Sequence, residues 1–131
     1  MKLLLVDDHE MVRLGLKSYL SMQDGVDQVL EASDGQEGVE LALQERPDVI
    51  IMDIVMPHMT GIEATLAILK EWSDAKILIL TSYLDNEKIY PVLDAGAKGY
   101  MLKTSSAEEI LRAIRKVERG ELAIETEVSQ K

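Results

Sequence analysis

The 131-residue chain contains no cysteine and no phenylalanine, has only three prolines, and lacks any long apolar stretch. Without cysteine, disulfide bonds and thiolate-ligated metal sites are excluded. The longest apolar runs fall far short of the roughly 20 residues that a membrane-spanning helix needs, and the apolar segment 2–6 is too short for a signal peptide. We therefore expect a cytoplasmic domain with no membrane partner.

Positive charge is also scarce, because 14 lysines and arginines stand against 24 aspartates and glutamates and the net charge is −10 at pH 7. Such a field repels the phosphate backbone of nucleic acids, so these residues are not expected to bind DNA or RNA themselves. The remaining composition, 47% hydrophobic and 29% charged, is ordinary for a soluble globular protein. The length predicts one domain with a sizeable core.

Short apolar segments alternate with amphipathic segments along the chain. The central apolar segments show no polar alternation, which is typical of parallel strands buried on both faces. Strict strand–helix alternation predicts a doubly wound α/β fold, in which right-handed crossovers place helices on both faces of a five-stranded parallel sheet. The predicted strands are 2–6, 26–32, 49–53, 76–81 and 98–103, and the predicted helices are 9–22, 36–45, 62–72, 83–95 and a last one from a cap at Ser105 or Ser106 to Gly120.

Two segments are predicted to depart from this regular pattern. Pro91 cannot lie deep inside a helix, so the regular part of the fourth helix is expected to be short and to begin near Tyr90. Residues 122–131 are polar and acidic, and we expect them to be the start of a linker or a C-terminal tail. The predicted domain therefore spans residues 1–121.

Polar residues stand where four of the strands end. Asp7 and Asp8 follow the first strand, Asp53 ends the third, Thr81 ends the fourth and Lys103 ends the fifth. Since parallel strands point the same way, these side chains are expected at one edge of the sheet, where open α/β sheets bind ligands. Two carboxylates 4 Å apart repel by about 4 kcal/mol at an effective dielectric constant of about 20. The carboxylates therefore need either a cation or raised pKa values. If a cation is bound, oxygen ligands favour a hard ion such as Mg²⁺.

The same residues suit phosphate chemistry. Lys103 can pair with one phosphate oxygen, and Thr81 can donate a hydrogen bond to another. The carboxylate of Asp53 can attack phosphorus and carry the group as an acyl phosphate. The two histidines, His9 and His58, have no partner histidine at a useful spacing, so both are predicted to be loop residues and not ligands.

Each of these residues, taken alone, also has an ordinary structural interpretation. Asp7 and Glu10 fit a helix capping box, and Thr81 fits a simple helix cap. Lys103 fits a solvated surface lysine, and Asp53 fits a turn residue. All four interpretations would have to coincide at one edge of the sheet, so the joint functional interpretation is favoured.

Four motifs contain these residues, namely Val6-Asp7-Asp8-His9, Met52-Asp53-Ile54-Val55-Met56-Pro57-His58-Met59-Thr60-Gly61, Leu80-Thr81-Ser82 and Gly99-Tyr100-Met101-Leu102-Lys103. Their order and separations resemble those of the receiver domains of two-component response regulators, over about residues 2–120. The first and last motifs are similar to the NarL/LuxR-type subfamily. The resemblance implies a flavodoxin-like (CheY-like) sheet of strand order 2-1-3-4-5.

The resemblance also implies roles for the residues at the sheet edge. Asp53 matches the phosphoacceptor, which receives phosphate from the phosphohistidine of a sensor histidine kinase. Asp8 would be a direct Mg²⁺ ligand, Asp7 would act largely through water, and the backbone carbonyl of Val55 would be a further ligand. The chain would then be a regulatory domain and not an enzyme, although it would promote phosphoryl transfer to, and hydrolysis from, its own aspartate.

The resemblance further implies a switch and an output. Thr81 and Lys103 match the switch hydroxyl and the phosphate-pairing lysine, and Tyr100 matches an aromatic residue that turns inward when Thr81 engages phosphate. Phosphorylation would promote a homodimer, through helices one and five or through the surface of helix four, strand five and helix five. DNA would be bound only by a C-terminal helix-turn-helix domain that these residues do not include.

Two other classes of protein fit parts of the pattern. A phosphohydrolase of the haloacid dehalogenase type would need a second aspartate two residues after its nucleophile, and Val55 stands there. A flavin-binding electron carrier would need a phosphate-binding loop after the first strand, where Asp7 and Asp8 would repel phosphate. Both alternatives are therefore less favoured than a receiver domain.

Overall fold

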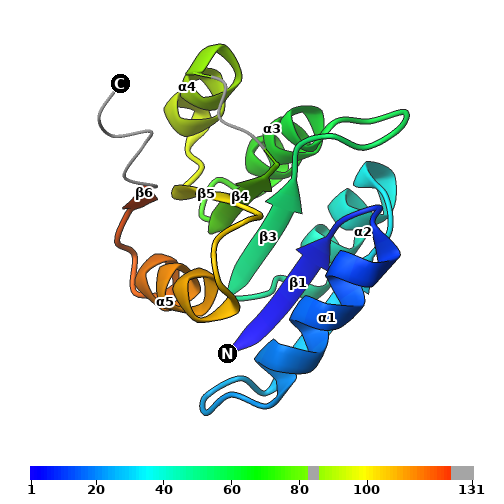
Figure 1. Cartoon of the computed structure of the whole chain (residues 1–131). Helices are drawn as coiled ribbons and strands as arrows, with labels where there is room; N and C mark the ends of the chain where they lie inside the picture. Colours follow the sequence, from blue (N-terminus) through cyan, green and yellow to red (C-terminus); the bar gives the residue numbers. More distant parts are fainter. Residues whose placement is uncertain (83–85, 125–131) are drawn as a thin grey trace.

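The computed structural model describes residues 1–82 and 86–124, in which parallel strands form a six-stranded sheet of order β2-β1-β3-β4-β5-β6 (Figure 1). The strands are β1 (Lys2–Val6), β2 (Gln28–Ala32), β3 (Val49–Asp53), β4 (Ile77–Thr81), β5 (Gly99–Leu102) and β6 (Ala123–Ile124). The helices are α1 (Glu10–Ser21), α2 (Gly35–Glu45), α3 (Gly61–Glu71), α4 (Asn86–Ala95) and α5 (Ala107–Glu118).

Helices cover both faces of the sheet. Successive strand residues point to opposite faces, and both sets are apolar here, so each face has its own core. Leu3 and Leu5 pack on one face in a core shared with α1 and α5. Leu4 and Val6 pack on the other face in a core shared with α2, α3 and α4. Burying a leucine or valine side chain contributes roughly 1.5–3 kcal/mol, so these two cores hold the central strands β1 and β3 rigidly in place.

The predicted doubly wound parallel fold and its strand order 2-1-3-4-5 are confirmed, with one addition at the sheet edge. Residues 123 and 124, which the sequence placed in a linker or tail, form the short strand β6. Ala123 is in register with Gly99, and Ile124 is in register with Tyr100. Two residues are too few to show a periodic pattern, so only the pairing with β5 reveals this strand. The rest of that predicted tail, 125–131, lies outside the described residues.

The prediction that α4 begins near Tyr90 is wrong. The helix begins at Asn86 and contains Pro91 in its interior. Proline has no N–H for the helical hydrogen bond to the carbonyl four residues earlier, which disfavours such a position. The loss is offset by tertiary packing, because Ile89 and Val92 are fully buried against the sheet core. Local propensity alone could not anticipate that compensation.

Helix α1 leaves much of its apolar surface uncovered. Only Leu20 is fully buried in it, whereas Met11 is 84% exposed and Val12 and Leu14 are also exposed. Exposed apolar side chains gathered on one helix are typical of an interaction surface.

No helix within 1–82 and 86–124 is long and apolar enough to cross a membrane.

Side-chain capping explains where α5 begins but not where α1 begins. Ser106 and Glu109 form the capping box predicted at the start of α5. The capping box of Asp7 with Glu10, the structural alternative at the start of α1, does not form, because the N-cap residue is His9 and its side chain makes no capping hydrogen bond. Asp7 instead accepts a 2.7 Å hydrogen bond from the backbone N–H of His9. The carboxylate of Asp7 is therefore turned toward the sheet edge.

Candidate functional site

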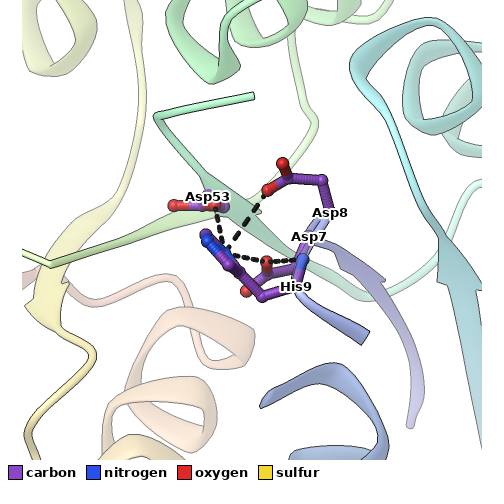
Figure 2. Close-up of side chains that lie close together, drawn as sticks. All are labelled: Asp7, Asp8, His9 and Asp53. Carbon is purple, nitrogen blue, oxygen red and sulfur yellow. Dashed lines mark hydrogen bonds and ion pairs between the residues drawn. The ribbon is translucent and has the colours of Figure 1, made fainter. Parts of the chain in front are cut away.

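The acidic residues predicted to converge do so at the carboxyl edge of the sheet (Figure 2). Asp7 and Asp8 follow β1, and Asp53 is the last residue of the neighbouring strand β3. The register pairs Val6 with Met52, which brings the two strand ends side by side. Asp53 is only 2% exposed, so its carboxylate lies inside the protein and not on a turn surface.

Lys103 completes this cluster from the far side of β4. Its Nζ lies 3.0 Å from Asp7 Oδ2 and 3.1 Å from Asp53 Oδ2. The backbone N–H of Lys103 donates a 2.6 Å hydrogen bond to the carbonyl of Thr81, which ties the lysine to the end of β4. Thr81 itself is buried at that end. The ordinary interpretation of Lys103 as a solvated surface lysine is therefore wrong.

His9 also lies in the cluster, although the sequence predicted it to be a loop residue without a ligand role. Its Nδ1 is 3.0 Å from Asp7 Oδ1, 3.4 Å from Asp8 Oδ1 and 3.7 Å from Asp53 Oδ2 (Figure 2). Potential ligand atoms of the four residues all lie within 4.8 Å of one another. The signal that could have placed His9 in the cluster is its position directly after the acidic pair, where the chain turns from β1 into α1.

The electrostatics of the cluster leave Asp53 short of positive partners. Burial raises the pKa of Asp53 above its ordinary value, the charge of Asp7 raises the pKa further, and Lys103 only partly opposes both effects. The Oδ2 atom of Asp53 is buried without a hydrogen-bond partner of good geometry, and its nearest cation is Lys103 Nζ at 3.1 Å. A second cation near these carboxylates would therefore be stabilised.

The loop after β3 holds Asp53 in place by a close backbone approach. The N–H of Gly61 donates a 2.8 Å hydrogen bond to the carbonyl of Ile54. A Cβ atom on Gly61 would lie 1.8 Å from the carbonyl oxygen of Asp53, which no side chain tolerates. Glycine is therefore required here by contact, and it lets α3 begin directly beneath the end of β3.

Arg13 of α1 holds the backbone of the acidic pair in place by a hydrogen bond to Asp7. Its Nη1 donates a 2.6 Å hydrogen bond to the backbone carbonyl of Asp7, and its Nε donates a 3.0 Å hydrogen bond to Glu31. Hydrogen bonds from Lys17 and Arg13 hold the pKa of Glu31 below its ordinary value, so this anchor stays ionised. Arg13 thus ties together β1, β2 and α1 at the point where the acidic pair leaves the sheet.

The two remaining predicted site residues differ in exposure. Val55 is half exposed, two residues after Asp53. Tyr100 is fully buried within the core on the face covered by α2, α3 and α4. The movement of this ring with phosphate, which the family resemblance implies, stays a prediction.

The chain matches the response regulator receiver domain family over residues 3–115, and it therefore belongs to that family of regulatory domains. Among curated proteins, it is 54% identical over 130 residues to the transcriptional regulatory protein LiaR of Bacillus subtilis. It is 47% identical over 127 residues to the response regulator protein VraR of Staphylococcus aureus. These matches include 99% and 97% of this chain but only 62% and 61% of the two relatives, so the chain spans about three fifths of their length.

Solved structures agree with this membership. A LuxR-family two-component response regulator from Aurantimonas sp. SI85-9A1 superposes with a TM-score of 0.92 at 34% identity, covering 98% of this chain and 92% of that one. A LuxR-family DNA-binding response regulator from Staphylococcus aureus superposes with a TM-score of 0.83 at 26% identity, covering 89% of this chain and 98% of that one. The resemblance to LuxR-type receivers, noted from motifs alone, therefore holds across the fold.

Proposed function

We propose that this chain is phosphorylated on Asp53 by the phosphohistidine of a sensor histidine kinase, with Mg²⁺ as cofactor. The single observation that carries the proposal is the buried carboxylate of Asp53, whose Oδ2 has no hydrogen-bond partner and lies between an acidic pair and Lys103. Membership in the receiver family supports the same assignment.

The donor set of the cluster fits Mg²⁺. The carboxylates of Asp7, Asp8 and Asp53 supply three oxygen ligands of the kind that this hard cation prefers. The backbone carbonyl of Val55 would supply a further oxygen. When bound, Mg²⁺ supplies positive charge that offsets the clustered carboxylates and the transferring phosphoryl group. Asp8 would be a direct ligand and Asp7 would act largely through water.

In the transfer step, an oxygen of Asp53 attacks phosphorus while the bond from phosphorus to the kinase histidine breaks, and the histidine nitrogen keeps the electron pair. Lys103 pairs with one phosphoryl oxygen, and the hydroxyl of Thr81 donates a hydrogen bond to another. Water later attacks the acyl phosphate and restores the carboxylate. The chain promotes both reactions on its own side chain, which is regulation and not turnover of a separate substrate.

The switch links Thr81 to Tyr100. When Thr81 moves toward the phosphoryl group, the space that it leaves admits the ring of Tyr100, and the surface around α4, β5 and α5 changes shape. The complete burial of the Tyr100 ring supports the proposal that the core has room for it at the inward end of this movement. Phosphorylation would then shift the population of an aromatic side chain between two positions.

The output is a homodimer that delivers C-terminal helix-turn-helix domains to paired DNA half-sites in the cytoplasm. The name of LiaR as a transcriptional regulatory protein and the LuxR-family structures support this output. We favour α1 as the dimer interface, because the apolar side chains of Met11, Val12 and Leu14 are exposed on this helix. The same helix continues directly from the acidic pair, so the site and this face are mechanically connected.

Incubation with acetyl phosphate tests the proposed function. Intact-mass analysis should detect one added phosphoryl group on the wild type with Mg²⁺, and none after chelation or in Asp53→Asn. Asp94→Asn, an exposed aspartate on α4, is the matched control and should be labelled normally. Labelling of Asp53→Asn at the wild-type level would overturn the assignment.

Sizing in the presence of beryllofluoride tests the dimer separately. The wild type should shift from monomer to dimer, and Met11→Glu should stay monomeric while still binding Mg²⁺. Met22→Glu is the control, because Met22 is 82% exposed at the opposite end of α1. A Met11→Glu protein that dimerises like the wild type would move the interface to another face.

A further inference from the structure

The side chain of His9 has no assigned role in the proposed phosphoryl transfer, yet it lies at the centre of the cation site. Its Nδ1 lies 3.0 Å, 3.4 Å and 3.7 Å from oxygens of Asp7, Asp8 and Asp53, in that order (Figure 2). Oxygen atoms from three separate carboxylates thus face one imidazole nitrogen. This arrangement is denser than a helix N-cap residue requires, and the side chain of His9 makes no capping hydrogen bond.

The contacts of Nδ1 cannot all be satisfied within the protein. Toward Asp7, the nitrogen would have to donate a proton, because a carboxylate only accepts. Toward Lys103 Nζ, which lies 3.1 Å away and only donates, the same nitrogen would have to accept. A divalent cation resolves this conflict, because it attracts the lone pair of Nδ1 and the carboxylate oxygens together.

We propose that His9 is a fourth side-chain ligand of this site, and that it makes the site favour divalent transition-metal ions that accept imidazole nitrogen, such as Ni²⁺, Co²⁺ and Zn²⁺. The proposal rests on the proposed function in that the same carboxylates hold the cation. A second observation, besides the distances of His9 Nδ1, points to a bound cation. Asp53 Oδ2 is buried, has no hydrogen-bond partner and faces the imidazole.

Ligand chemistry explains the expected selectivity. Imidazole is a good ligand for Ni²⁺, Co²⁺ and Zn²⁺, whereas Mg²⁺ prefers carboxylate, carbonyl and water oxygens. An imidazole at this position therefore adds more affinity for the first group than for Mg²⁺. Binding with His9 as a ligand also requires Lys103 Nζ to leave its place beside Nδ1 and Asp53. Such an ion would occupy the side of Asp53 from which Lys103 is proposed to pair with phosphate.

Calorimetric titration of tag-free protein with Ni²⁺ and with Mg²⁺ tests the proposal. The measured quantity is the ratio of the two affinities, in which any effect common to both ions cancels. His9→Asn should lower the preference for Ni²⁺ at least roughly tenfold, since losing even an outer-shell partner costs about 10- to 100-fold in metal affinity. His58→Asn is the matched control, because His58 is the other histidine of the chain and is an exposed loop residue.

Co²⁺ absorption supplies a second readout that does not depend on affinity. The visible bands of the bound ion should shift between the wild type and His9→Asn and should be unchanged in His58→Asn. Equal Ni²⁺ preference and equal Co²⁺ bands in the wild type and His9→Asn would overturn the proposal, and so would an equal loss in His58→Asn. His9 is 54% exposed, so its replacement leaves the core intact.

The outcome also separates this inference from the proposed function. If the Ni²⁺ preference falls in His9→Asn but acetyl phosphate does not label Asp53, the metal site stands and the phosphoacceptor assignment fails. If Asp53 is labelled but the preference does not change, the phosphoacceptor assignment stands and the role of His9 fails.

Discussion

Lys103 Nζ lies 3.1 Å from Asp53 Oδ2 and therefore occupies space beside the carboxylate that a cation would also use. The same ammonium is 3.0 Å from Asp7 Oδ2, so one lysine partly neutralises two buried carboxylates. In the unphosphorylated protein, the negative charge of these carboxylates is thus balanced partly by Lys103 and partly by any cation that binds the site. Lysine and cation repel each other while they compete for the same oxygens.

Replacement of this lysine should strengthen magnesium binding. In Lys103→Met, the competing ammonium is removed and a chain of similar length remains, so we expect Mg²⁺ affinity to rise by about tenfold, equivalent to about 1.4 kcal/mol. Calorimetric titration measures this change. Lys98→Met, a partly buried lysine at the other end of β5, is the control. Weaker Mg²⁺ binding in Lys103→Met would show that the lysine organises the site and does not compete for it.

The raised pKa of Asp53 predicts that its ionised carboxylate lowers the stability of the folded protein at neutral pH. Burial and Asp7 raise the pKa of this carboxyl above 3.8, so above its folded-state pKa the native protein carries an ionised group that its surroundings disfavour. Asp53→Asn should therefore have a larger free energy of unfolding than the wild type at neutral pH without Mg²⁺. Urea titrations at a series of pH values measure the difference.

The sign of the pH dependence follows from proton uptake. As the pH falls through the raised pKa, native wild type binds a proton before the unfolded chain does, so the wild type gains stability and the advantage of Asp53→Asn narrows. Below the unfolded-state pKa the dependence on Asp53 ends. If the stability difference between Asp53→Asn and the wild type grew as the pH fell, the raised pKa of Asp53 would be contradicted. Asp94→Asn should show no such trend, because Asp94 is exposed on α4.

Gly61→Ala should be severely destabilising. The new methyl group would lie 1.8 Å from the carbonyl oxygen of Asp53, so either α3 or the end of β3 must move. We expect a loss of at least about 3 kcal/mol in the free energy of unfolding, at the upper end of single substitutions, together with weaker Mg²⁺ binding. Gly15→Ala is the control, since a Cβ there meets nothing within 4 Å. In helix α1 that change should add roughly 0.5–1 kcal/mol of stability.

Thr65→Val should stabilise the protein. Thr65 of α3 is completely buried, and its Oγ1 has no hydrogen-bond partner. Valine has the same branched shape without the hydroxyl, so it removes an unsatisfied polar atom and should raise the free energy of unfolding by about 1 kcal/mol. Thr60→Val makes the same chemical change where the hydroxyl caps α3, and it should cost about 1 kcal/mol. A loss of stability in Thr65→Val would mean that its hydroxyl has a partner.

Much of the fold and of the site was predictable because a few local patterns encode them. The unbroken apolar segment that ends in Asp53 indicated a strand buried on both faces, and β3 is buried throughout. Placing Lys103 at a strand end was enough to predict its meeting with Asp53, since parallel strands share one carboxyl edge. Such positions follow from chain direction and periodicity, which a sequence shows directly.

Other features depended on contacts between distant segments. Ala123–Ile124 becomes a strand only because β5 offers it a free edge, and Pro91 lies within α4 because Ile89 and Val92 are buried in the core. His9 lies beside the buried carboxylate of Asp53 because β1 and β3 end side by side. The sequence by itself determined five of the strands, their direction and the acidic edge. Tertiary structure alone decided which neighbouring side chains reach that edge, because side-chain distances depend on how the strand ends and the first turn of α1 pack together.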